Sequence, residues 1–578
     1  MRNAVVLSLT LALAGCGSGG GNGDGGIPGA TLVVTPADPV IEILNGTIPV
    51  QAFTATISFA DGTTQDVSAT ATWTIDDTEL GTFTDQVFRP TGFRGGQGIV
   101  RASWSGTSGT TGITVRIKTV RVVDPAPPNA PDLFDGASED GSRAPALVYP
   151  ADRTMVPPNL GDFEVHWANA AVGNDLFKVT LGSATVELSV YLLFPIPADP
   201  TTLWTAFTPD EWAVARDSSR GSSLKLSVRG MLSAMPTAAG TSPQFAIRVG
   251  DEDLQGGIYY WAASASGIYR HDFGQPGQPP QAFYSPTESG GRCVACHALS
   301  RDGTKMAVTF DGGDGAATVI DVASRTPFFP GDGSVRSNFT VFNPEATRML
   351  MTSAGGITLR DPTTAAVLGT VPTPGYATHP DWSPQGDLIT YVAVGGPTGS
   401  DWHFSGGRIV VQPYDGSSDT FGAAVDLVPA DPTGNLYYPT FSPDGQWILY
   451  NRSIEDAYDD GSAEIYVVRV DGTVAPLLVS TPNLGPGLTN SWGRWAPFEQ
   501  TTTGETPEPL FWFTFSSKRA FGVRLGAGRP QIWMAPFFPA RSGDPSLPAF
   551  RLPFQDLATS NHIAQWTEVV VPVGAPAP

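Results

Sequence analysis

The sequence is short of charged residues. They make up 15% of the 578 residues, against about 25% in an ordinary soluble domain. The 33 basic residues are outnumbered by 55 acidic ones, which leaves a net charge of −22. Such a chain has little with which to neutralise a phosphate backbone, so nucleic-acid binding is excluded as its main role.

Long hydrophobic runs are also missing. Beyond the N-terminus, no apolar stretch approaches the length of about 18 residues that marks a membrane-spanning helix. The 66 glycines and 52 prolines argue against long helices as well, since both residues interrupt them. The chain nevertheless has 14 Trp, 30 Phe and 14 Tyr, which is enough to build large cores and excludes global disorder. These features predict an all-β, multidomain protein.

The N-terminus has the three parts of an export signal. A basic start at Met1–Asn3 is followed by an apolar run, Ala4–Ala14, which is too short to span a bilayer. The run ends in Leu-Ala-Gly-Cys16, which resembles the lipobox of bacterial lipoproteins. That resemblance implies that residues 1–15 are a signal peptide and that Cys16 carries a lipid anchor. An ordinary signal peptide with an incidental cysteine is the alternative.

A glycine-rich spacer, residues 16–29, follows the anchor position. Its composition is typical of a flexible tether. By resemblance to enterobacterial sorting, the lack of Asp directly after Cys16 favours the outer membrane. We therefore expect an exported protein that is held in the bacterial cell envelope by its lipid.

Two β-sandwich modules are expected next. Residues 30–120 contain alternating strand-like runs separated by turn signals, and they resemble bacterial Ig-like domains. Residues 121–144 are rich in proline and predict a stiff hinge. Residues 145–275 are weakly similar to fibronectin type III domains, with Thr208–Trp212 as a short capped helix.

The rest of the chain, residues 276–578, is repetitive. Segments that share an apolar strand end, a tight turn of the Ser-Pro-Asp-Gly type and a returning apolar strand recur about every 40 to 60 residues, the size of one propeller blade. The clear copies lie at residues 298–308, 341–351, 381–391 and 440–450, with degenerate copies at 494–513 and near 561–566. Pro and Gly fit the backbone angles that such turns require. The repeat resembles the TolB-like (WD40-like) β-propeller repeat, which implies a propeller of five or six blades.

The sequence Cys293-Val-Ala-Cys296-His297 is the attachment motif of c-type haem. Its two thiols can add to the two vinyl groups of one porphyrin, and the adjacent His297 can bind the iron from the proximal side. Apart from Cys16, these are the chain's only cysteines, which argues against a chance match. A disulfide between Cys293 and Cys296, followed by an unrelated histidine, is the alternative.

The haem motif opens the first propeller repeat. Cys296 lies three residues before the aligned apolar residue of its repeat, and equivalent positions in a propeller form a ring at one mouth of the central channel. The equivalent residues in the other copies are Phe339, His379, Tyr438 and Trp492. We therefore expect one covalent haem c at an aromatic-lined mouth, with His379 as the distal iron ligand and His562 as the alternative.

The expected function is one-electron transfer by a mono-haem cytochrome with a redox or envelope protein as partner. No metalloprotease, hydrolase-elbow or phosphate-loop motif occurs in the sequence, so an electron carrier or binding protein is favoured over an enzyme. Two alternatives remain: a non-redox propeller scaffold in which the two cysteines form a disulfide, and a haem sensor or enzyme with an open distal site.

Overall fold

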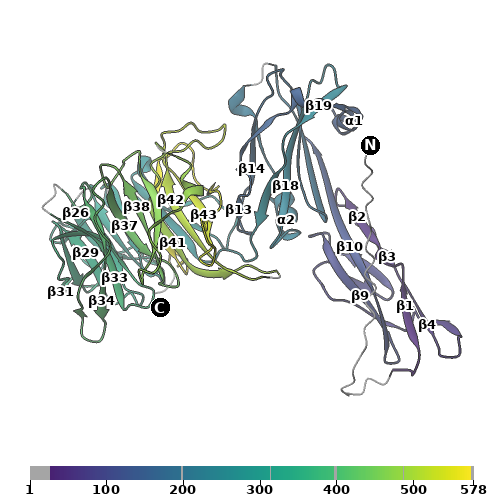
Figure 1. The fold of residues 1–578 in the computed structure, drawn as a ribbon, viewed down its shortest axis with the longest axis horizontal. Coiled ribbons are helices and arrows are strands. Elements are labelled where there is room, and N and C mark those ends of the chain that lie inside the picture. The colour runs from purple at the N-terminus through teal and green to yellow at the C-terminus, as the bar shows by residue number, and fades with distance from the viewer. Residues whose placement is uncertain are drawn as a thin grey trace. The chain divides into compact units, whose positions relative to one another are not determined.

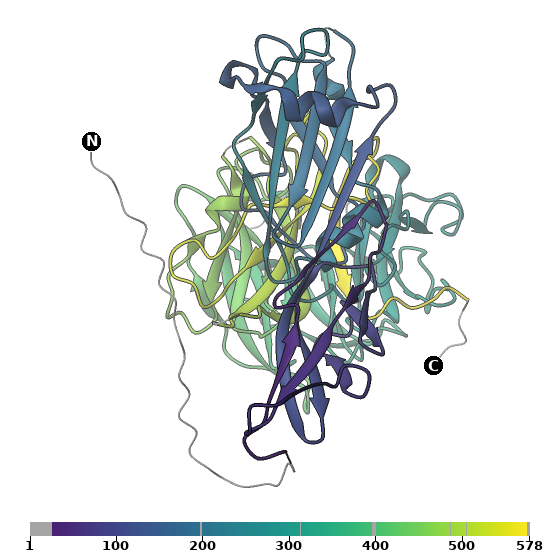
Figure 2. The ribbon, with the colours of Figure 1, turned by 90° about the vertical axis from the view of Figure 1, so that its right-hand side faces the viewer.

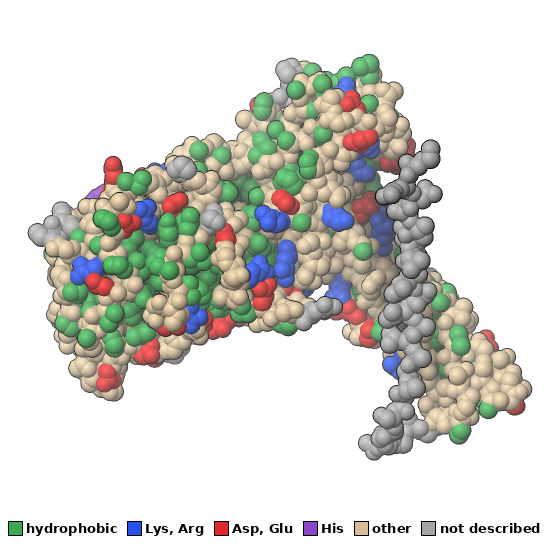
Figure 3. All heavy atoms as spheres, viewed as in Figure 1, with side chains coloured by type: hydrophobic (Ala, Val, Ile, Leu, Met, Phe, Trp, Pro, Cys, Tyr) green, Lys and Arg blue, Asp and Glu red, His purple; other side chains and the backbone are tan. Residues whose placement is uncertain are grey.

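A computed structural model describes residues 26–196, 199–312, 314–395, 400–485, 487–504 and 506–574. The chain divides into two compact units (Figure 1). The first contains residues up to 115, except for the short segments 44–46 and 93–95, and the second contains those segments and everything from Arg116 onward. On the face shown in Figure 3, Lys and Arg side chains are scattered among acidic ones.

The first unit is built from short strands whose side chains alternate between buried and exposed, as expected for sheets with one covered face. Its core includes Phe53, Trp73 and Phe83, whose ring centroids lie 5.7–6.0 Å apart. The strands are β1 (Thr31–Thr35), β2 (Val40–Leu44), β3 (Gln51–Ala52), β4 (Thr54–Ser58), β5 (Thr64–Asp66), β6 (Thr72–Ile75), β7 (Gly81–Thr84), β8 (Val87–Pro90), β9 (Gly96–Trp104) and the first part of β10 (Thr107–Val122), whose residues from Arg116 onward belong to the second unit.

The predicted hinge, residues 121–144, is instead part of the second unit's packed structure. It forms α1 (Ala130–Gly136), β11 (Ser138–Glu139) and the 3-10 turn η1 (Gly141–Arg143). Ala126, Ala130 and Phe134 are buried in one cluster with side chains of the neighbouring sheet. The prolines of this segment therefore shape a docked connection, because burial of apolar side chains outweighs the extended preference of a Pro-rich sequence.

The second unit begins with a β module. Its main sheet follows the order β11-β19-β18-β15-β16-β10, and β12-β14-β17 form a smaller sheet. The predicted capped helix is present as α2, where Thr208 and Glu211 form a capping box. The elements are β12 (Ala146–Tyr149), β13 (Met155–Val156), β14 (Glu164–Ala168), β15 (Leu176–Gly182), β16 (Val186–Leu193), η2 (Pro200–Thr202), β17 (Trp204–Ala206), α2 (Pro209–Asp217), β18 (Ser223–Met231), β19 (Ala238–Thr241) and β20 (Phe245–Val249).

Six further sheets, counted among the described residues, form a β-propeller. The innermost strands contact one another in the cyclic order β45, β24, β28, β32, β37, β41. The elements are β21 (Gly257–Ala262), η3 (Ala263–Ala265), β22 (Gly267–Asp272), β23 (Gln281–Tyr284), β24 (Val294–Leu299), β25 (Lys305–Phe310), β26 (Gly315–Asp321), β27 (Arg336–Ser337), β28 (Thr340–Phe342), β29 (Met349–Ser353), β30 (Gly356–Arg360), β31 (Val367–Thr370), β32 (Tyr376–Trp382), β33 (Leu388–Val394), β34 (Gly407–Asp415), β35 (Thr420–Phe421), β36 (Val425–Val428), β37 (Asn435–Phe441), β38 (Trp447–Ser453), β39 (Glu464–Arg469), β40 (Leu477–Leu478), α3 (Ser480–Asn483), β41 (Ser491–Thr501), β42 (Pro509–Ser517), β43 (Gln531–Phe537), β44 (Phe550–Arg551) and β45 (Asn561–Thr567).

The ring is closed by its C-terminal strand. Strand β45 pairs with β21, and β22 and β23 complete that blade; β45 is the yellow strand among the propeller strands in Figure 2. The degenerate copy near residues 561–566 is therefore a blade strand, and the fold is all-β with a six-bladed propeller. The propeller starts at Gly257 rather than at residue 276, because Gly257–Ala262 pairs with β45 and Gly267–Asp272 pairs with Gly257–Ala262 in the same blade.

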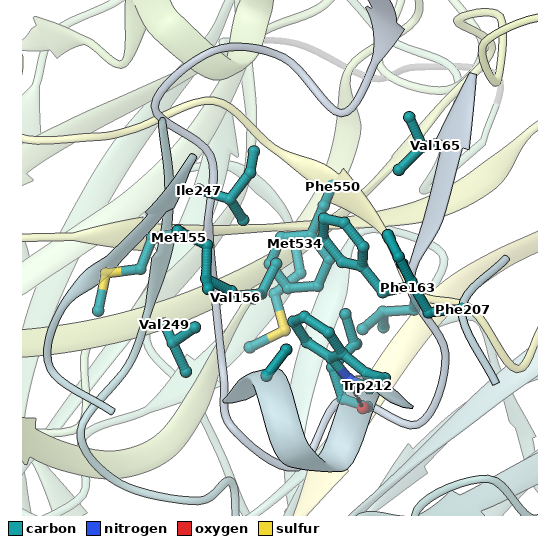
Figure 4. Packing of buried hydrophobic residues seen from close by; sticks show 14 of the residues in the cluster. Met155, Val156, Phe163, Val165, Phe207, Trp212, Ile247, Val249, Met534 and Phe550 are labelled. Carbon is teal, nitrogen blue, oxygen red and sulfur yellow. Dashed lines mark hydrogen bonds between the residues drawn. The ribbon is translucent and has the colours of Figure 1, made fainter. Parts of the chain in front are cut away.

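The preceding module and the propeller share one hydrophobic core. Figure 4 shows Met155, Phe163 and Trp212 of the module packed with Met534 and Phe550 of the propeller. The Phe163 and Trp212 rings are stacked with centroids 4.6 Å apart. Because this apolar surface is continuous, the module predicted for residues 145–275 is joined to the propeller rather than linked to it as a separate domain.

Candidate functional site

The equivalent positions of the six inner strands meet in the centre of the propeller. Cys296, Phe339, His379, Tyr438 and Trp492 line a single internal cavity, together with Ile563 of the closing strand. We call these six residues the aromatic band. Alignment of the repeats had grouped the first five of these residues, and Ile563 joins them in the structure. Their role in haem binding stays a prediction.

A β-bulge aims these side chains at the channel. The strand register shifts next to Cys296, His379, Tyr438 and Trp492, and a bulge redirects the extra residue. His379, Tyr438 and Trp492 adopt φ values of 51°, 50° and 58°, and Ile563 adopts 56°. Non-glycine residues seldom take positive φ, so its recurrence in four blades indicates a geometry that the ring imposes.

The rings of the aromatic band contact one another across blades. The Phe339 and His379 centroids lie 4.2 Å apart, those of His379 and Tyr438 4.1 Å, and Tyr438 and Trp492 are stacked at 3.9 Å. Aromatic pairs at such distances stabilise each other beyond the effect of burial. The cavity that remains among them is about 30 Å³, about the space that one water molecule occupies.

A second, polar set of side chains lies two residues further along the same strands. Asp381, Thr440, Arg494 and Gln565 line a hollow of about 140 Å³ at the turn side of the channel. We call these four residues the polar band. Arg494 Nη1 lies 3.3 Å from Asp381 Oδ1, and Asp381 Oδ2 accepts a hydrogen bond from Phe441 N–H. Burial raises the pKa of Asp381, and the Arg494 charge opposes that rise.

The two cysteines of the predicted haem motif are free thiols, and both are half-buried. Cys293 directly precedes β24, and Cys296 lies within that strand. Burial raises the pKa of the Cys296 thiol to about 11, so this sulfur is protonated at neutral pH. A protonated thiol is a poor nucleophile, and Cys296 therefore has no activated character of its own.

His297 is buried and neutral. Burial lowers the pKa of its imidazole to about 4. Its Nε2 lies 3.4 Å from the Tyr259 carbonyl oxygen, while its Nδ1 is buried with no hydrogen-bond partner among the described residues. Since a carbonyl only accepts, Nε2 carries the proton, and the free lone pair is on Nδ1.

His379 and His562 differ in their surroundings. The Nδ1 of His379 accepts a weak hydrogen bond from Tyr438 N–H at 3.4 Å, and its Nε2 has no partner within the described part of the chain. Burial holds the pKa of His379 well below its usual value. His562 packs against the Trp261 ring at 4.7 Å, and burial lowers its pKa to about 4.

The donor set suits a c-type haem, whereas the channel does not enclose one in this arrangement. Cys293, Cys296 and His297 supply the two thiols and the imidazole that covalent attachment and proximal ligation need. The cavity among the ring side chains takes about one water and not a porphyrin. No group of three or more His, Cys, Asp or Glu among the described residues is arranged to hold a metal ion. A haem held inside the channel would require the aromatic band to move.

The predicted lipidation site, Cys16, lies outside the described residues. Within the described part, no helix is both long and apolar enough to cross a membrane.

Comparison with known proteins identifies no family. No family model and no curated protein matches the sequence. Among solved structures, TolB from Acinetobacter baumannii is 13% identical with a TM-score of 0.31, covering 78% of this chain and 96% of that one. A protein described as TolB from Agrobacterium tumefaciens is 14% identical with a TM-score of 0.31 and coverages of 55% and 93%. Hydrazine synthase of Kuenenia stuttgartiensis is 13% identical with a TM-score of 0.27 and coverages of 44% and 73%. Such values support no inference about activity, and the propeller assignment follows from the sheet topology itself.

Proposed function

We propose that this protein is a lipid-anchored c-type cytochrome that carries one haem on Cys293 and Cys296 and transfers single electrons. One observation carries the proposal: the only cysteines beyond Cys16 have the spacing of a haem attachment motif, and both thiols are free beside the propeller's inner strand. Bound there, the haem would supply a one-electron redox centre.

The chain's own side chains would have to rearrange around the haem. His297 would become the proximal ligand through Nε2, which requires that this nitrogen lose its proton and give up the Tyr259 carbonyl. His379 could coordinate through Nε2 only if the proton moved to Nδ1, where Tyr438 N–H now donates. His562 is the alternative distal ligand. Mutation of the true distal ligand would remove a sixth ligand and change the spin state of the iron.

The signal peptide and Cys16 support export and attachment to the cell envelope, and the sequence after Cys16 favours the outer membrane. The electron would pass to or from another redox protein of the envelope. Because the chain carries a net charge of −22, a basic partner would be attracted to it electrostatically.

The deciding experiment is a reduced pyridine haemochrome spectrum of the full chain, exported from a host that has a cytochrome c maturation system. We expect a c-type spectrum with one haem per chain that survives denaturation, and its complete loss in the Cys293→Ala/Cys296→Ala variant. The matched control is Cys16→Ser, which should keep the haem and release the protein from the membrane. A colourless, folded wild-type protein would overturn the proposal.

The filled channel favours a second candidate function, a non-redox binding scaffold. The aromatic band leaves space for about one water, as expected if the centre of the ring is structural. In that case oxidation would join Cys293 to Cys296 without loss of the fold. Mass measurement after thiol labelling separates the two functions, because a haem-bearing chain gains the mass of a haem, whereas a disulfide-bearing chain loses two hydrogen atoms (two protons and two electrons).

A further inference from the structure

A second hollow of the molecule lies away from the channel, where the module of residues 145–249 meets the closing blade. It has a volume of about 250 Å³, just below the range of about 300–1,000 Å³ that is typical of small-molecule pockets. Its wall is formed by residues 159–162, by strand β22 and the turn after it, and by residues 553–554. These segments belong to the same compact unit.

Aromatic and proline side chains make up much of the wall. The His271 imidazole is stacked on the Phe554 ring with centroids 4.0 Å apart and planes 14° apart, and it meets the Phe273 ring edge-on at 5.4 Å. Pro279 and Pro280 of the following turn line the same cavity. Burial lowers the pKa of His271 to about 4, so the imidazole is an uncharged ring at neutral pH.

Asp162 is the only residue of this wall that is charged at neutral pH. No hydrogen bond or ion pair joins its carboxylate to another described residue, although most exposed acidic groups of this chain have such a partner. Its pKa is raised by partial burial and by the nearby Glu164 carboxylate, which means that the site lacks a compensating positive charge. No Lys or Arg belongs to the wall.

Of the two amide side chains of the wall, Asn159 and Gln278, the first already has its hydrogen-bond partners. Asn159 donates to the Leu254 and Phe273 carbonyls and accepts from Leu254 N–H. The cavity therefore offers a negative charge and aromatic surface but few free hydrogen-bonding groups. A ligand that suits it is small and positively charged, and it does not depend on donating several hydrogen bonds.

From this arrangement we propose that the cavity binds a small organic cation of the quaternary ammonium class, with Asp162 as counter-ion and the His271–Phe554 stack as part of its wall. Quaternary ammonium groups bind well to aromatic surfaces, because the ring faces carry partial negative charge and the methyl groups give up little hydration. The proposal concerns a site separate from Cys293–His297, and it does not depend on the haem.

The test compares choline with its neutral isostere, 3,3-dimethylbutan-1-ol, by isothermal titration calorimetry on the purified mature chain. We expect saturable binding of choline and binding of the alcohol at least tenfold weaker, which corresponds to about 1.4 kcal/mol. Equal affinity for the two compounds, or the absence of saturable choline binding, would overturn the proposal.

Two variants assign the binding to this cavity. Asp162→Asn should weaken choline binding about tenfold and leave the melting temperature unchanged, because its side chain is exposed. Asp210→Asn removes an exposed carboxylate of the same module that does not line the cavity, and it should bind choline like the wild type. Equal weakening in both variants would attribute the effect to overall charge and would contradict the site.

Discussion

Two of the hollows of the second unit, the central channel and the Asp162 cavity, are built in opposite ways. The central channel is lined by equivalent residues of repeated strands, and their side chains fill it to about 30 Å³. The cavity at Asp162 is lined by segments that do not repeat, and it keeps about 250 Å³. The comparison teaches that symmetry brings like residues together and lets them pack against one another, whereas an irregular junction leaves space for a ligand.

The largest effect is expected from opening the channel. Trp492 is 8% exposed and stacked on Tyr438, so Trp492→Ala should lower the free energy of unfolding by about 3–5 kcal/mol. Chemical denaturation measures this change, and Trp402→Ala, which removes a less buried indole, should cost less. Choline binding should be unaffected. A small cost for Trp492→Ala would mean that the channel is not tightly packed.

Acid should act on the Asp162 cavity through His271. Its pKa is lowered from 6.5 to about 4 by burial, opposed by Asp272 and by the backbone of Gln278. The neutral imidazole therefore stabilises the fold fully above pH 6.5, and this stabilisation, about 3 kcal/mol, is lost as the pH falls toward 4. His271→Phe, which keeps an aromatic ring on Phe554, should reduce the pH dependence of unfolding over this window, and the other buried histidines account for the part that remains. An unchanged slope in this variant would contradict the assignment.

The polar band should be sensitive to the loss of one charge. Arg494→Met leaves the Asp381 carboxylate without its ion partner, and we expect a loss of about 2 kcal/mol, because the pair is partly exposed. The double variant Asp381→Asn/Arg494→Met should recover part of that loss. Denaturation midpoints of the single and double variants measure the coupling, and simple additivity would show that the two charges do not interact.

The smallest effect tests whether a water molecule lies within the aromatic band. The Tyr438 hydroxyl is buried with no hydrogen-bond partner among the described residues, so Tyr438→Phe should raise the free energy of unfolding by up to about 1 kcal/mol. Tyr259→Phe is the matched control, because its hydroxyl accepts a hydrogen bond from Arg270 and its loss should destabilise. If Tyr438→Phe destabilised as well, a water in the channel would be serving that hydroxyl.

The sequence repeats allowed us to predict which residues line the channel, but they did not predict the polar band or the backbone conformation. Alignment of the copies placed Phe339, His379, Tyr438 and Trp492 in one ring, because equivalent strand positions in a propeller face a common axis. It gave no sign of the polar band, whose members differ in kind from blade to blade. The positive φ of Tyr438 was also hidden, since tyrosine does not favour that conformation.

Long-range pairing limited the prediction of the fold. The strands at residues 257–272 were predicted as a continuation of the preceding module, because β45, the partner of Gly257–Ala262, lies about 300 residues further along the chain. The shared core of Phe163 and Trp212 with Met534 was invisible for the same reason. An alternating strand shows that one face is buried, but it does not show what buries it. The Asp162 cavity lies at this same junction, and it could not be predicted from the sequence for the same reason.

The pairing of β21 with β45 also sets the order of events during synthesis. The first three strands of the propeller emerge early, with the edge of β21 unpaired until Asn561–Thr567 arrives. An open strand edge is prone to wrong pairing, and contacts this distant in sequence form slowly. A chain that stops before β45 would expose that edge permanently, so a short C-terminal truncation should turn a stable protein into one that aggregates or is degraded.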